Sequence, residues 1–218
     1  MEDWAGLKKE LNVAFNEATL LGFEVDATRR LGAATFGVLT LPVEGVPPED
    51  SRVQVLFSPV GRVTASLRKG RWDDPSAEVI PFQLSELLGI VQSFRGQPIY
   101  GWEFFDVHDD ELLRWRGRVS LDWRSGSDGI ARSMSVTQES QIGPKQFLSL
   151  IVWFDKLTVR TPDGAAVDVD EFAAGGRRWW DGLFAGDERT RNAGIFPLKP
   201  PDVEEKPGAE ECTGENHE

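Results

Sequence analysis

The densest group of potentially reactive side chains surrounds His108. Carboxylates stand close to it on both sides, at Asp106, Asp109, Asp110 and Glu111. An imidazole and carboxylates together can bind a divalent cation or exchange a proton with a substrate. The spacing matches neither an EF-hand nor a zinc motif, and one short loop offers its ligands from one side only. We therefore expect a solvated turn here and no metal site.

Two further carboxylates, Glu24 and Glu103, follow similar glycine-aromatic pairs about 80 residues apart. A pair of equivalent acids can perform general acid/base catalysis. Both alternate with bulky apolar neighbours, however, which is typical of outward-facing strand positions. The catalytic alternative is a carboxylate-based hydrolase or a small-ligand-binding protein, with Glu24, Glu103, Asp106 and His108 lining a site between the two segments.

Three arginines at alternate positions, Arg114, Arg116 and Arg118, would lie on one face of a strand. Such a row can bind an anion or a nucleic acid backbone. Charge pairing with Glu103 and neighbouring acids explains the same pattern, and their aliphatic stems can cover the sheet. The structural explanation is favoured, and a surface that binds a partner is the alternative.

A second arginine-rich motif combines Arg177 and Arg178 with Trp179 and Trp180. Guanidinium groups beside indole rings can bind stacked or anionic ligands. A helix that anchors its aromatic side in the core has the same residue pattern, and this anchor is the favoured interpretation.

The common catalytic motifs are missing from the sequence. It contains no phosphate-binding glycine loop, dinucleotide fingerprint, His-Glu-x-x-His zinc motif or Gly-x-Ser-x-Gly elbow. Cys212 is the only cysteine, which excludes an intrachain disulfide and a four-cysteine zinc site. We therefore expect no catalytic residues, no bound metal and no cofactor, although catalysis by carboxylates alone stays open.

The chain is acidic, with a formal net charge of −12 over 218 residues. The stretch 197–218 has seven acids and two lysines, so it carries −5 and the rest carries −7. This field repels nucleic acid phosphates, so nucleic acid is not an expected partner. No apolar run has the roughly 20 residues of a membrane-spanning helix, and nothing resembles a secretory signal. We therefore expect a cytoplasmic protein, and the excess of arginine over lysine, with many Gly, Ala and Val residues, indicates a bacterial source.

A short pattern occurs twice and indicates a tandem duplication. Phe15, Gly22-Phe23-Glu24 and Gly37 recur, after about 80 residues, as Phe94, Gly101-Trp102-Glu103 and Gly117. The expected fold class is α+β. A unit of one helix plus an antiparallel β-meander is expected to occur twice in tandem, closed by a third helix. The expected division is a first repeat at 1–83, a second repeat with the terminal helix at 84–184, and a linker with an acidic disordered tail at 185–218.

The individual elements follow from periodicity and turn residues. Helices are expected at 3–18, 85–94 and from a cap at Asp170 to about 184. Strands are expected at 20–26, 35–43, 131–138 and 147–159, and a hairpin over 53–67 that turns at Pro59-Val60-Gly61. A second hairpin is expected to place Trp102 opposite Trp115, with its tip near residues 107–110.

These observations together predict an acidic, non-enzymatic protein that binds another protein. The many aromatic residues before the acidic tail and the absence of the common catalytic motifs support this expectation. Small acidic proteins that neutralise or chaperone basic partners, such as toxin-immunity proteins, are an analogy at the level of class only. The sequence does not identify the partner.

Overall fold

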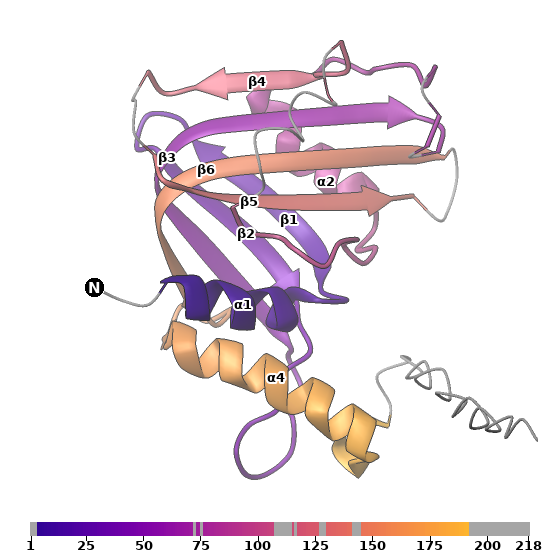
Figure 1. Ribbon diagram of the computed structural model, residues 1–218. Helices are drawn as coiled ribbons and strands as arrows, with labels where there is room; N and C mark the ends of the chain where they lie inside the picture. The colour runs from indigo at the N-terminus through magenta and orange to yellow at the C-terminus, as the bar shows by residue number, and fades with distance from the viewer. Residues whose placement is uncertain are drawn as a thin grey trace, which may run out of the picture.

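The computed structural model describes residues 4–71, 73–74, 76–106, 115, 117–126, 130–140 and 145–191, and His108, Arg114 and Arg116 lie outside them. The described chain has an α+β fold, in which three α-helices accompany one antiparallel sheet of seven strands (Figure 1). The α-helices are α1 Trp4–Phe15, α2 Leu87–Ser93 and α4 Val169–Ala185, and two 3-10 turns are η1 Leu84–Glu86 and η2 Glu188–Thr190. The strands are β1 Thr19–Asp26, β2 Leu31–Gly37, β3 Arg52–Lys69, β4 Leu121–Arg124, β5 Arg132–Glu139, β6 Gln146–Arg160 and β7 Ala166–Val167. Among the described residues, no helix is both long and apolar enough to span a membrane.

The sheet is built around its two long strands, β3 and β6. The strand order is β1-β2-β3-β6-β5, with β4 added to β3 and β7 added to β6. One half of β3 pairs with β2 and the other half pairs with β4, while β6 accompanies nearly its whole length. The sheet therefore joins strands from both sides of residue 83 and bends along its long strands (Figure 1).

The expected hairpin turn at Pro59-Val60-Gly61 is wrong, because β3 continues through these residues. The β3–β6 pairing instead shifts register between Val60 and Arg62, as in a β-bulge. The shift leaves Gly61 as the extra residue, and Pro59 stands two residues before it. The turn residues that suggested a hairpin thus mark the position of an irregularity within one long strand.

The two edges of the sheet are connected by residues 98–106. At one end, the Ile99 amide donates to the carbonyl oxygen of Ala18, just before β1, at 2.8 Å. The next amide, of Tyr100, donates to the Thr137 carbonyl oxygen of β5, also at 2.8 Å. This irregular segment therefore bridges β5 to the start of β1 and turns the bent sheet into a nearly closed body.

We predict that Gln138→Leu lowers the free energy of unfolding by about 1–2 kcal/mol, because the Gln138 side chain of β5 hydrogen-bonds to β1 and to the residue just before the bridging segment. Its side chain is only 1% exposed and donates from Nε2 to the carbonyl oxygens of Leu20 at 3.2 Å and Gln97 at 2.8 Å. Leucine keeps the volume but leaves both carbonyls without this donor. Urea unfolding followed by circular dichroism measures the loss. A matched Thr158→Val variant on β6 should change stability little, and an equal effect of the two would contradict the assigned role.

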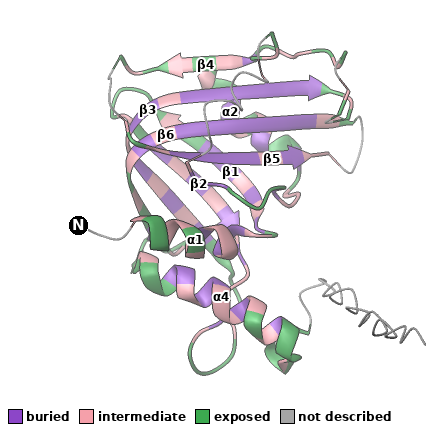
Figure 2. Cartoon of the chain, in the orientation of Figure 1, coloured by how far each residue is buried: buried purple, intermediate pink, exposed green. Residues whose placement is uncertain are grey.

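The main hydrophobic core lies inside the bent sheet, whose long strands are largely buried (Figure 2). It contains a chain of phenylalanines. Phe57 of β3 contacts Phe154 of β6 with ring centroids 4.8 Å apart, and Phe23 of β1 at 5.9 Å. Phe15 at the end of α1 packs on Phe36 of β2 at 5.0 Å. Helix α1 thus covers this core through its C-terminal turn.

The second copy of the repeated pattern does not form the expected hairpin. Phe23 lies in β1 and is 1% exposed, whereas its counterpart Trp102 is outside any strand and is 83% exposed. Trp115 is in a turn, and the strand in this region, β4, begins only at Leu121. The predicted Trp102–Trp115 pairing is therefore wrong, and the tandem duplication stays a prediction. Alternating aromatic residues at 100–104 indicated a strand. Sequence alone could not show that this segment lies along β5 without forming a regular strand.

The N-cap of the last helix lies two residues before the expected cap at Asp170. Asp168 has extended backbone angles, and its carboxylate accepts from the Glu171 amide at 2.9 Å. Asp168 is therefore the N-cap, and Asp170 lies in the first helical turn, where an acid favours the helix dipole. Gly186 closes the other end with φ of 76°, a left-handed conformation that glycine adopts without strain.

Candidate functional site

Asp106, one of the predicted site residues, is occupied by structural contacts. Its carboxylate accepts a hydrogen bond from the Trp4 indole Nε1 at 2.7 Å and one from the Ser133 amide at 3.3 Å. The Lys8 ammonium lies 3.8 Å away, and the Arg132 guanidinium stacks 4.2 Å from the Trp4 ring centroid. Asp106 therefore fastens the start of α1 to β5.

Glu24 and Asp106, two of the carboxylates considered for a hydrolytic site, are associated with different halves of the sheet. Glu24 belongs to the row formed with Ala33 of β2 and Leu56 of β3, in the half of the sheet that β2 completes. Asp106 instead bonds to Ser133, which is paired with Trp153 in the half that β5 completes. Glu103 is exposed on the irregular segment. The described residues contain no cluster of three potential metal ligands, and a site shared by these acids stays a prediction.

Of the three arginines in the proposed stripe, only Arg118 falls in the described part of the chain. It is close enough to Arg68 for its charge, after the larger effect of burial, to lower the pKa of that guanidinium. Arg68 in turn stacks on Phe147, 4.8 Å from the ring centroid. These contacts place Arg118 near a buried cation at the end of β3.

The motif Arg177-Arg178-Trp179 attaches α4 to the rest of the molecule. Arg177 forms two hydrogen bonds with the Glu10 carboxylate of α1, and this bonding lowers the pKa of Glu10. Trp179 is 3% exposed and forms a small second core with Leu41 and Leu183. These contacts agree with the interpretation of the motif as a helix anchor.

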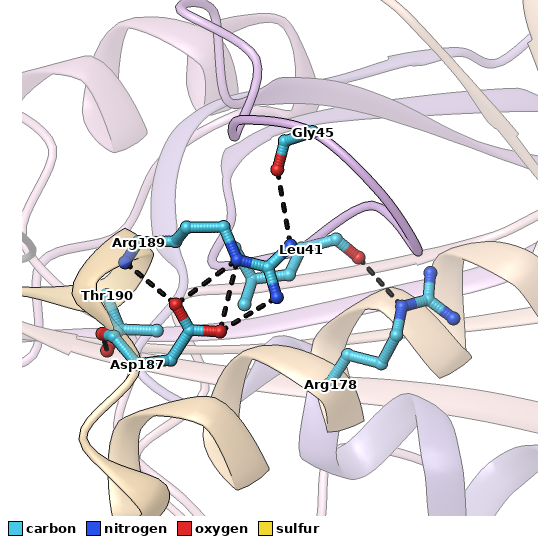
Figure 3. A network of polar contacts seen from close by, with 6 residues as sticks. All are labelled: Leu41, Gly45, Arg178, Asp187, Arg189 and Thr190. Atoms are coloured by element: carbon cyan, nitrogen blue, oxygen red, sulfur yellow. Dashed lines mark hydrogen bonds and ion pairs between the residues drawn. The ribbon is translucent and has the colours of Figure 1, made fainter.

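The β2–β3 loop, residues 38–51, is held against α4 by hydrogen bonds from arginine side chains (Figure 3). Arg178 donates from Nε to the Leu41 carbonyl oxygen at 3.0 Å. Arg189 donates to the Gly45 carbonyl oxygen at 3.2 Å. The Asp187 carboxylate accepts hydrogen bonds from both Nε and Nη2 of Arg189, and this bonding lowers the pKa of Asp187. The loop therefore has a defined position although it contains no regular structure.

Glycine lets the loop backbone approach the helix. The Leu41 amide donates to the Gly175 carbonyl oxygen at 3.0 Å. A Cβ atom at Gly175 would lie 3.4 Å from the Leu41 carbonyl oxygen, so a larger side chain would press directly on the loop. Gly176, unusual inside a helix, is explained by close packing on α1, since a Cβ atom there would lie 2.4 Å from the Ala14 Cα atom.

Two groups of exposed or half-buried apolar side chains accompany the C-terminal half of α4. Val43 and Val46 are on the β2–β3 loop, and we call them, together with Trp179 of the adjoining groove, the α4–loop surface. Trp180 and Phe184 are instead on the helix face of Gly176, which packs on Ala14 of α1. Val43 is 68% exposed, Val46 80% and Phe184 64%. The Phe184 ring packs on Trp180 with centroids 6.1 Å apart, and Trp180 meets Trp179 edge-on at 5.0 Å. Figure 1 shows this half of α4 projecting beyond α1, and Figure 2 shows the exposed loop beside it.

A groove adjoins the α4–loop surface between the loop and the helix end. It has a volume of about 770 Å³, and Val46, Glu49, Trp179 and Arg189 are among its lining residues. Because its walls come from the loop, α4 and the η2 turn, its shape depends on the arginine contacts described above. The groove and the exposed side chains next to it form the best candidate for a binding site.

The chain matches no protein-family model. Searches of curated proteins and of solved structures also found no match. The functional conclusion therefore rests on this surface and on its chemistry.

Sequence reasoning did not select the β2–β3 loop, although a signal is present. Val43 and Val46 stand in a segment rich in proline and glycine, where apolar side chains have no strand or helix to bury them. An apolar residue in such a loop either packs elsewhere or stays exposed for a partner. The residues that hold the loop in place, Arg178 and Arg189, are more than 130 positions later in the chain.

Proposed function

We propose that this protein binds another protein through the α4–loop surface and performs no catalysis. The observation that carries the proposal is the exposure of Val43 and Val46 on a loop that is held in place beside the groove lined by Trp179. Protein interfaces gain most of their binding energy from a few side chains, above all Trp, Tyr and Arg, in desolvated pockets at the centre of the contact, and surrounding apolar contacts exclude water. Clustered exposure of this kind on one face is typical of an interaction site.

The fixed position of the loop also favours binding. Hydrogen bonds from Arg178 and Arg189 hold two of its carbonyl groups, and the Leu41 amide bonds back to α4. A loop that is already ordered loses less conformational entropy when a partner binds. The proposal includes a cytoplasmic setting in a bacterial cell and, by class analogy only, an immunity-like or chaperone-like role.

We predict that a photoreactive phenylalanine analogue placed at Val46 will crosslink to a specific protein in cells of the native host. Val46 is the more exposed of the two valines and lines the groove. A discrete adduct, seen as a shifted band and identified by mass spectrometry, is the expected result. A Gly175→Val variant should lose this adduct, because its side chain displaces the loop.

The matched control places the same analogue at Leu31, which is 43% exposed at the start of β2. This position tests whether any exposed apolar residue gives the same product. The proposal is wrong if position 46 gives no adduct, or if positions 31 and 46 give the same adducts with equal yield.

A further inference from the structure

The arginines around the α4–loop surface are already paired with acids. Each arginine at position 52, on α4, or in residues 186–191 forms an ion pair: Arg52–Asp50, Arg177–Glu10, Arg178–Glu171, Arg189–Asp187 and Arg191–Glu188. Arg178 and Arg189 also donate to loop carbonyl groups. The positive charge near the surface is therefore neutralised by partners on the same chain.

Two acids beside the apolar anchors are left without such pairing. Glu44 and Glu49 are exposed on either side of Val46, and neither forms an ion pair within the described residues. Glu49 lines the same groove as Val46 and Trp179. The surface therefore combines exposed apolar side chains with a surplus of negative charge.

We propose that the α4–loop surface recognises a basic amphipathic segment of its partner, which places apolar side chains on Val43 and Val46 and in the groove lined by Trp179, and lysine or arginine beside Glu44 and Glu49. This inference rests on the proposed function and names the chemistry of the partner. Complementary charge at the rim of an interface accelerates association and selects among partners.

The same charges argue against two other occupants. A second copy of this chain would bring Glu44 and Glu49 against the same residues, and like charges across an interface oppose binding. The C-terminal stretch 197–218 carries a net charge of −5, so it too is repelled. A basic segment of another protein is the occupant that the charges favour.

The test uses two fluorescent peptides of about 15 residues, a length sufficient for helix formation. One peptide carries leucines on one face of a helix and lysines on the opposite face. In the other peptide every lysine is replaced by glutamate. Fluorescence anisotropy with the full chain should show binding of the leucine-lysine peptide, weakening as salt is added because salt screens exposed charges. The leucine-glutamate peptide should not bind.

Variants assign the binding to this surface. Glu44→Gln combined with Glu49→Gln should weaken binding of the leucine-lysine peptide about twofold to fivefold for each charge removed, the range for exposed charge pairs. Glu24→Gln combined with Glu103→Gln removes the same charge elsewhere and should leave binding unchanged. Val46→Ser should weaken it further, because an exposed apolar anchor is lost.

The outcomes separate the inference from the function on which it rests. Equal binding of both peptides, or equal effects of the two double variants, overturns the basic partner. If Val46 still gives a specific crosslink in that case, protein binding stands and only the partner chemistry is wrong. Tight binding of an oligolysine without apolar residues would also overturn the amphipathic segment. An absence of both peptide binding and crosslinking overturns both proposals.

Discussion

Phe57→Ala will lower the free energy of unfolding by about 3–5 kcal/mol, the usual cost of removing a buried phenylalanine. Phe57 is fully buried in the middle of the central strand β3. Its ring contacts Phe23 on one side and Phe154 on the other, so it connects β1 with β6 through the core. Its removal leaves a cavity between long strands that cannot close without disturbing their pairing.

Guanidinium unfolding monitored by far-ultraviolet circular dichroism measures this loss. Phe184→Ala is the matched control, because Phe184 is 64% exposed and its truncation should change stability by less than about 0.5 kcal/mol. If Phe57→Ala does not fold, Phe57→Leu gives a smaller and measurable loss. Equal stability of the variants at positions 57 and 184 would contradict the assigned core.

Regular periodicity allowed the correct prediction of several elements. The expected strands 131–138 and 147–159 correspond to β5 and β6, and the expected helix over 3–18 contains α1. The second strand was misplaced at 35–43, because Gly32, Ala33 and Ala34 have low strand propensity, whereas β2 spans Leu31–Gly37. Those small residues are in the strand because β1 and β3 pair with them on both sides.

The candidate site was much harder to predict, because its parts are distant in the sequence. Arg178 and Trp179 were recognised, but their contacts with Leu41 form only when α4 reaches the β2–β3 loop. No local pattern in residues 38–51 shows that this loop is held in place. Asp106 was considered for catalysis because of its acidic neighbours, and its contacts with Trp4 and Ser133 follow from tertiary structure alone.

Gly176→Ala will destabilise the protein by about 3 kcal/mol, although alanine is the better helix former. A Cβ atom at position 176 would lie only 2.4 Å from the Ala14 Cα atom and 2.5 Å from its Cβ atom. The nearest atom is backbone, so α1 would have to move away from α4. That movement would strain the Glu10–Arg177 ion pair and the contacts of Phe15 with the core.

Gly89→Ala provides a control of the opposite sign. Gly89 is exposed in α2, and a Cβ atom there would meet nothing within 4 Å. Helix propensity alone predicts that this change stabilises the protein by about 0.5–1 kcal/mol. Thermal unfolding and hydrogen exchange of the α1 amides distinguish the two effects, because only Gly176→Ala should increase exchange in α1. If both substitutions stabilised the protein, propensity would dominate at position 176, and α1 would not pack on α4 as closely as described.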